Sequence, residues 1–166
     1  MIHAETAVRA GKLFDQARRD GLNVPAAIVF GAGRIGEVGA VAAGVTGGRK
    51  ALLVFGGRSA ARSGLSDRVA ASLAERGFAV EVFAGVDREP TAQMVNAAAA
   101  TVRRARPDLV VSLGGGSVMD CAKAAAALAT NDGCVEDYLE GVGRGCRVAV
   151  PPIPHLAAPT VAGTGA

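Results

Sequence analysis

Short apolar runs, several rich in β-branched residues, alternate along the chain with longer segments in which apolar residues recur at helical spacing. The runs are AAIVF (26–30), ALLVF (51–55), AVEVF (79–83), DLVVSL (108–113) and RVAV (147–150). Apolar runs of this length predict strands that are covered on both faces of a sheet. We therefore expect five strands joined by helical connections.

The segments between these runs predict the helices. Residues 66–77, 91–105 and the alanine-rich 117–133 have helical spacing, whereas the glycine-rich segment 34–48 predicts a weak helix. Strands that alternate with helices of this length predict βαβ units. The expected fold class is α/β, a Rossmann-like three-layer sandwich with a mostly parallel sheet.

Composition and charge narrow the class of protein further. The chain has 166 residues, of which 50% are hydrophobic and 20% charged, so we expect a packed domain. Its densest basic stretch, Arg103 to Arg106, lies at the end of a predicted helix, where positive charges interact favourably with the helix dipole. No aromatic residues interleave with these arginines, as they would in many nucleic-acid-binding surfaces. We therefore expect no nucleic-acid partner.

The sequence also lacks the marks of export or membrane insertion. We find no apolar signal core and no run of eighteen apolar residues, so we expect no membrane partner and a cytoplasmic location. The three cysteines are odd in number and lack C-x-x-C spacing, which argues against a disulfide framework or a thiolate metal site.

Two glycine-rich loops are candidates for binding a phosphate. GAGRIG (31–36) matches G-x-G-x-x-G but leads into the weak helix, whereas GGGSVMD (114–120) follows an apolar run and opens the strongest helix. Ser117 and Asp120 have S-x-x-D spacing, so we expect Ser117 to cap that helix and to face a phosphate oxygen. The alternative is that both loops are ordinary strand-to-helix turns.

The second loop also carries a family resemblance. LGGGSVMDCAK (113–123) resembles the G-G-G-S-x-x-D-x-A-K signature of the iron-containing (group III) alcohol dehydrogenases. IVFGAGRIGEVG (28–39), VFAGVDREPTAQMV (82–95) and APTVAGTGA (158–166) resemble further family segments in the same order. The resemblance implies a dinucleotide-binding domain over 26–166, preceded by a leader over 1–25 that we expect to be helical.

The resemblance assigns the pyrophosphate of NADP or NAD to the second glycine loop and a structural role to the first. The implied cofactor-binding residues are Gly56, Gly57, Ser59, Gly115, Gly116, Ser117, Asp120 and Thr160. Lys123 matches the signature as well. Gly56 stands where NAD-preferring relatives carry an aspartate, and Arg58 and Ser59 can donate to a 2′-phosphate, so NADP is expected over NAD. The alternative is that Arg58 and Arg62 are solvated loop charges.

Other features of the family have no counterpart here. Members of this family transfer hydride between the nicotinamide and a small alcohol or aldehyde. They use Fe²⁺ or Zn²⁺, held by one aspartate and three histidines of a second, helical domain. We expect that domain to be absent from this chain. His3 and His155 are assigned no role, so no catalytic or metal-binding residue is expected in this chain, and no turnover by it alone. Glu89 replaces an asparagine of the family, which predicts reduced cofactor affinity.

Two alternatives stay open on the sequence. The chain can belong to a related subclass, namely the maleylacetate reductases, glycerol dehydrogenases or hydroxyacid–oxoacid transhydrogenases. Alternatively, it is a non-catalytic nucleotide-binding domain whose exposed apolar surface drives self-association into a homo-oligomer.

Overall fold

A computed structural model describes residues 27–56 and 62–161 of the chain. The chain divides into two units, residues 1–32 and 33–166, and all the regular elements described below belong to the second. In the first unit, the described residues 27–32 form neither helix nor strand, so the strand expected at 26–30 is wrong for residues 27–30. Residues 1–25, the expected leader, lie outside the described segments.

The second unit is built on a parallel sheet of four strands. β1 (Lys50–Phe55) pairs with β2 (Ala79–Phe83) on one side and with β3 (Leu109–Gly114) on the other, and β3 pairs with β4 (His155–Pro159). The spatial order is β2-β1-β3-β4. The central strands β1 and β3 are almost wholly buried, as their unbroken apolar sequences predicted.

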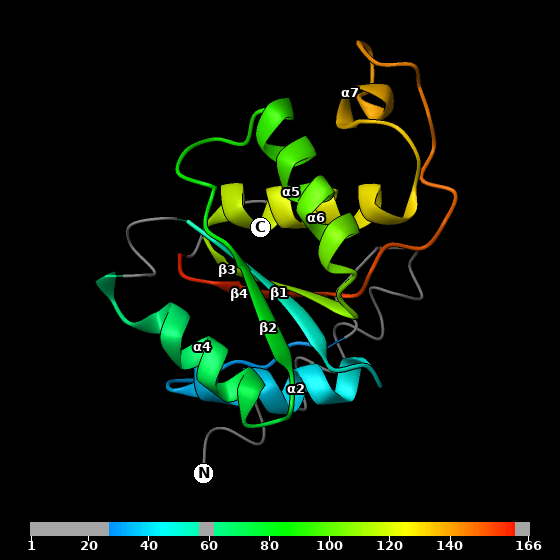
Figure 1. Cartoon of the computed structure of the whole chain (residues 1–166). Coiled ribbons are helices and arrows are strands. Elements are labelled where there is room, and N and C mark those ends of the chain that lie inside the picture. The colour runs from blue at the N-terminus through cyan, green and yellow to red at the C-terminus, as the bar shows by residue number, and fades with distance from the viewer. Residues whose placement is uncertain (1–26, 57–61, 162–166) are drawn as a thin grey trace, which may run out of the picture. The chain divides into compact units, whose positions relative to one another are not determined.

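Helices cover both faces of this sheet (Figure 1). α5 (Ala92–Ala105) and α6 (Gly116–Thr130) pack on one face, and α2 (Val38–Val45) and α4 (Leu65–Ala74) pack on the other. A short 3₁₀ helix, η1 (Arg34–Glu37), leads into α2, and α7 (Val135–Tyr138) follows α6. The three layers confirm the predicted Rossmann-like α/β sandwich. No helix within the described segments has the length and apolar character that crossing a bilayer requires.

Local sequence explains where the helix α5 begins and ends. The Thr91 side chain accepts a hydrogen bond from the Met94 amide at 3.3 Å and so caps the first turn. Arg106 adopts a left-handed conformation (φ 47°) and is followed by Pro107, which cannot continue the helix. The predicted helix 91–105 is therefore confirmed.

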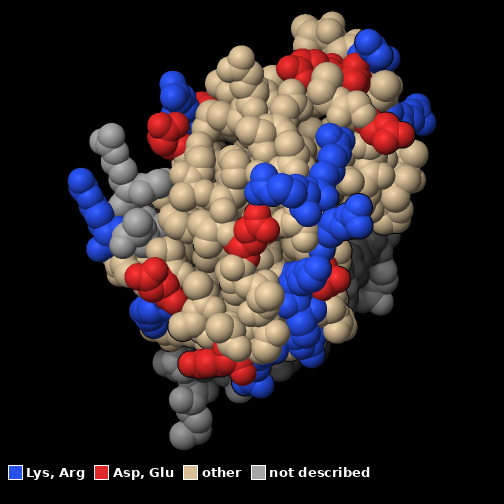
Figure 2. Space-filling model, viewed as in Figure 1, with Lys and Arg blue, Asp and Glu red and all other residues tan. Residues whose placement is uncertain are grey.

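The arginines that end α5 are engaged within the molecule. Arg103 donates to the backbone carbonyls of Leu128, Asn131 and Gly133, at 2.6, 3.0 and 3.1 Å, and Arg104 pairs with Glu81 at 2.8 Å. Figure 2 shows a broken stripe of Lys and Arg side chains across this view, with Asp and Glu beside it. The basic stretch noted in the sequence thus ties α5 to the end of α6 and to β2.

Asn131 holds the carboxyl end of α6. Its side-chain amide donates to the carbonyls of Ala127 and Val150, at 2.8 and 2.9 Å, while its oxygen accepts from the amides of Ala149 and Val150, both at 2.9 Å. These bonds satisfy backbone groups that would otherwise lack partners at a helix end. The same bonds engage the amides of Ala149 and Val150. The strand predicted at 147–150 is therefore wrong, and β4 begins at His155 instead.

Candidate functional site

The carboxyl edge of the sheet brings together segments that are distant in the sequence. In the parallel register Phe55 lies opposite Leu113, and Gly114 opposite Pro159. The residues that leave these strands, Gly56, Gly115 and Thr160, therefore lie along one edge, and the Thr160 amide donates to the Gly114 carbonyl at 2.9 Å. Ligands of α/β folds bind at this edge.

The glycine loop after β3 opens directly into α6. Gly115 is the N-cap residue with an extended backbone (φ −82°, ψ −171°), and its carbonyl accepts hydrogen bonds from the amides of Val118 and Met119. A Cβ at Gly114 would lie 2.5 Å from a methyl group of Val118, whereas a Cβ at Gly116 would meet no atom within 4 Å. Gly114 thus permits close strand–helix packing, and Gly116 leaves room above the helix N-terminus for a ligand to approach the backbone.

Two details of the predicted loop are wrong. Because α6 begins at Gly116, Ser117 lies inside the first turn and makes no capping hydrogen bond. Its hydroxyl donates instead to a carboxylate oxygen of Glu89 at 3.1 Å. Asp120, exposed one turn further on, lies 3.5 Å from the Lys123 ammonium and does not complete a capping box.

The earlier loop, GAGRIG, lacks the context of a phosphate site. No strand precedes it in residues 27–30, and it leads into four residues of 3₁₀ helix without a side-chain cap. Gly33 adopts a left-handed conformation (φ 78°) that turns the chain into η1. Of the two loops, the one after β3 has the strand before it and the α-helix after it that a phosphate-binding loop requires.

Gly56, at the end of β1, sits against the segment that follows β2. A Cβ at this position would lie 2.9 Å from the carbonyl oxygen of Val86, so the backbone approaches closely and a larger residue would displace it. Gly57, Arg58 and Ser59, which the sequence placed near the adenosine ribose, lie outside the described residues. Arg62 is described and exposed.

His155, which the sequence placed in a proline-rich connection, is the first residue of β4. Its Nε2 lies 2.8 Å from the hydroxyl of the fully buried Ser112. Burial, with a smaller contribution from the Lys123 charge, lowers the pKa of His155 to about 4. His155 is therefore neutral near pH 7 and serves the packing between β3 and β4.

We expect this histidine to make the chain acid-sensitive. Its pKa is about 4 in the folded chain and 6.5 when unperturbed, so the unfolded state binds more protons between these values and stability falls as pH falls. Between pH 7 and pH 5 the wild-type free energy of unfolding should drop by about 2 kcal/mol more than that of His155→Gln. Urea denaturation of both proteins at each pH measures this difference, and equal losses would contradict it.

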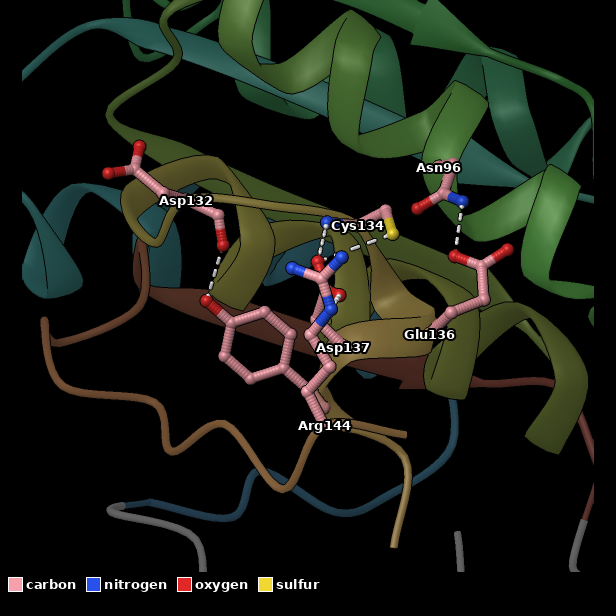
Figure 3. A network of polar contacts seen from close by, with 7 residues as sticks. Asn96, Asp132, Cys134, Glu136, Asp137 and Arg144 are labelled. Carbon is pink, nitrogen blue, oxygen red and sulfur yellow. Dashed lines mark hydrogen bonds and ion pairs between the residues drawn. The ribbon is translucent and has the colours of Figure 1, made fainter. Parts of the chain in front are cut away.

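A cluster of polar side chains lies around α7 (Figure 3); its labelled members are Asn96, Asp132, Cys134, Glu136, Asp137 and Arg144. Asn96 of α5 donates to Glu136 at 2.8 Å and accepts from the Val135 amide at 2.9 Å, which docks α7 on α5. Asp137 accepts from the Cys134 amide at 3.1 Å and pairs with Arg144, also at 3.1 Å.

The ionisation of this cluster follows from its contacts. The hydrogen bond from the Cys134 amide lowers the pKa of Asp137, and the one from Asn96 lowers the pKa of Glu136. The neighbouring carboxylates, Glu136 first, raise the pKa of the Cys134 thiol, which makes it a poor nucleophile. The cluster thus holds α7 against α5. The contacts of Asn96 with Glu136 and Val135 join residues 40 and 39 positions apart, which sequence spacing does not reveal.

The described residues do not fit a metal ion. Within residues 27–56 and 62–161, no three His, Cys, Asp or Glu side chains lie together as ligands would. His3 lies outside these segments, and His155 is paired with Ser112. We derive no metal-dependent step for these residues.

Comparison with known proteins extends these observations. The model of the family described as iron-containing alcohol dehydrogenase matches residues 25–166. The chain is 38% identical to long-chain-alcohol dehydrogenase 1 of Geobacillus thermodenitrificans, over 71% of this chain and 30% of that protein. It is 42% identical to the NADPH-dependent butanol dehydrogenase of Clostridium saccharobutylicum, over 46% of this chain and 20% of that protein.

Solved structures agree with the sequence matches. The crystal structure of NADH-dependent butanol dehydrogenase A from Thermotoga maritima superposes with a TM-score of 0.76 at 32% identity, covering 87% of this chain and 35% of that one. The chain thus spans about a third or less of the length of these relatives.

Fold and sequence together define the class of this protein as a Rossmann-like α/β unit of an oxidoreductase family. The matched region takes in both glycine loops and the segment after β4. The chain belongs to the iron-containing alcohol dehydrogenase family, as its motifs predicted.

Proposed function

We propose that this chain is the nucleotide-binding part of a metal-dependent alcohol dehydrogenase and that it captures the cofactor along the carboxyl edge of its sheet. The observation that carries the proposal is the loop after β3. Its Gly116 leaves open space above the N-terminus of α6, beside Gly56 and Thr160 at the same edge. The positive end of the helix dipole and free backbone amides suit a diphosphate.

In this proposal each cofactor-binding residue has a defined part. Gly115 and Gly116 bring the backbone close to the pyrophosphate, and Ser117 offers its hydroxyl to a phosphate oxygen. Thr160 lies at the same edge of the sheet, just after β4 ends, and the Asp120 carboxylate lies 3.5 Å from the Lys123 ammonium near the first turn of α6. We assign Gly56 to the adenosine ribose, and we assign Gly57 and Ser59, which lie outside the described residues, to the same part of the cofactor on the sequence resemblance alone.

The reaction of the whole enzyme would be hydride transfer between the nicotinamide and a small alcohol or aldehyde. A metal of the kind that the family resemblance implies would act as a Lewis acid toward the substrate oxygen in the whole enzyme. The described residues contain no cluster for it, so we assign this chain cofactor capture and orientation.

We further propose that the cofactor is NADP rather than NAD. The names of similar proteins include both an NADPH-dependent and an NADH-dependent butanol dehydrogenase. Two features support NADP: Gly56 carries no carboxylate to repel a 2′-phosphate, and the following segment contains Arg58 and Ser59. The close approach of Val86 to Gly56 leaves no room for a side chain there.

Isothermal titration of the chain with each nucleotide tests this proposal. We expect NADP to bind about tenfold more tightly than NAD, because the 2′-phosphate adds charge-assisted hydrogen bonds. Arg58→Gln should remove that preference while leaving NAD binding unchanged. Equal or tighter binding of NAD would contradict the NADP assignment, and failure of both nucleotides to bind would contradict the proposed function.

A further inference from the structure

The loop between β2 and α5 places a carboxylate at the first turn of α6. The Ser117 hydroxyl donates to Glu89 at 3.1 Å, across 28 positions of sequence. The loop is anchored on both sides of Glu89: Val86 is buried in the core, and Thr91 caps α5. The loop backbone is thus anchored on both sides of Glu89, which places its carboxylate within reach of Ser117.

The charge of Glu89 is not neutralised by an ion pair within the described residues. Arg88, its neighbour, pairs with Asp87 at 3.1 Å, and Lys123 on α6 lies 3.5 Å from Asp120. Glu89 itself is exposed, and Ser117 is half-buried. The negative charge therefore lies beside the helix N-terminus, which attracts anions.

We infer that Glu89 is a built-in competitor for the anion site at the start of α6. In the nucleotide-free chain its carboxylate accepts the Ser117 hydroxyl, and a cofactor diphosphate must displace it to accept the same hydrogen bond. This inference rests on the proposed function, because it assigns the diphosphate to that turn. Binding of the cofactor is then coupled to displacement of the Glu89 side chain from Ser117, and the repulsion between the carboxylate and the diphosphate weakens binding.

The substitution Glu89→Gln isolates the charge, because glutamine keeps the size and an oxygen that can accept from Ser117. We expect the variant to bind NADP and inorganic pyrophosphate about tenfold more tightly than the wild type at ~20 mM salt, where charge repulsion is weakly screened. At ~0.5 M salt the two proteins should differ by no more than about threefold. Isothermal titration at both salt concentrations gives these ratios.

Glu75→Gln is the matched control. It makes the same change in net charge at an exposed residue, but at the end of α4, where the chain turns toward the amino end of β2. Its affinity for either ligand should equal that of the wild type, and the thermal unfolding midpoints of all three proteins should agree.

The outcomes separate this inference from the proposed function. If wild type and Glu89→Gln bind with equal affinity, the competitor role is wrong and cofactor binding stands. An equal gain in Glu75→Gln would also overturn the inference, since net charge alone would then explain it. If no variant binds NADP or pyrophosphate, the proposed function fails, and the inference fails with it.

Discussion

Replacement of Gly39 by alanine is expected to destabilise the chain by about 3 kcal/mol or more, because the new methyl group has nowhere to go. A Cβ at Gly39 would lie 1.8 Å from the carbonyl oxygen of Ser72 and 2.5 Å from its carbon, and backbone atoms cannot rotate aside as a side chain does. The Gly39 amide also donates to the Ser72 hydroxyl at 3.0 Å, and that hydroxyl donates to the Gly36 carbonyl at 2.7 Å. Separating α2 from α4 would break both bonds.

The same helix provides a matched control in Gly44. A Cβ there meets no atom within 4 Å, and the residue is exposed, so Gly44→Ala should stabilise α2 by about 0.5–1 kcal/mol through helix propensity. Urea denaturation followed by circular dichroism measures both changes, which suits a chain without tryptophan. A Gly39→Ala protein as stable as the wild type would show that the α2–α4 contact is looser than described.

Alanine at Gly116 is expected to weaken NADP binding about 30-fold, or ~2 kcal/mol, without harming the fold. The methyl group would occupy the open space through which the diphosphate reaches the helix N-terminus. Because alanine is the better helix former, the variant should unfold at the same or a higher temperature. Loss of binding therefore cannot be explained by loss of folding.

Gly36→Ala distinguishes the two glycine loops. It places the same methyl group in the GAGRIG turn, where a Cβ also meets no atom within 4 Å. We expect NADP affinity to be unchanged in this variant. If Gly36→Ala weakens binding and Gly116→Ala does not, the diphosphate binds at the earlier turn and the proposed site is wrong.

The helix and the buried strands with the clearest hydrophobic patterns were predicted correctly. The helix at 117–133 and the buried strands 51–55 and 108–113 were found within a few residues of their expected limits, because long alanine-rich and unbroken apolar segments have few alternative structures. The carboxyl-edge location of the second glycine loop followed from the parallel sheet itself.

Two errors near the end of the described chain, the strand wrongly predicted at 147–150 and the missed strand β4, have a physical reason. A strand needs a partner for its backbone groups, and sequence alone does not reveal the partner. The amides of Ala149 and Val150 are taken by the Asn131 side chain, so RVAV forms no strand. β4 has a histidine at its start and a proline at its end, so its apolar run is only three residues long (156–158). In the described sheet it is an outer strand, where proline is tolerated.

The position of the second glycine loop between a strand and a helix was predicted, but its contacts were not. Spacing placed Ser117 as the helix cap, whereas the N-cap is Gly115, two residues earlier, and the Ser117 hydroxyl donates to Glu89. Spacing cannot anticipate this contact, since it depends on how the loop after β2 folds across the edge of the sheet.

Asn131 and Arg103 fasten the far end of α6, and this has a consequence for the end that faces the proposed ligand. The hydrogen bonds of its last turn to two other segments oppose sliding or rotation of α6 if a nucleotide binds at its N-terminus as proposed. The dipole is thus oriented in advance, and association forfeits little ordering entropy in the helix itself. We therefore expect any rearrangement on binding of the proposed nucleotide to occur in the loops around α6, while the helix keeps its position in the fold.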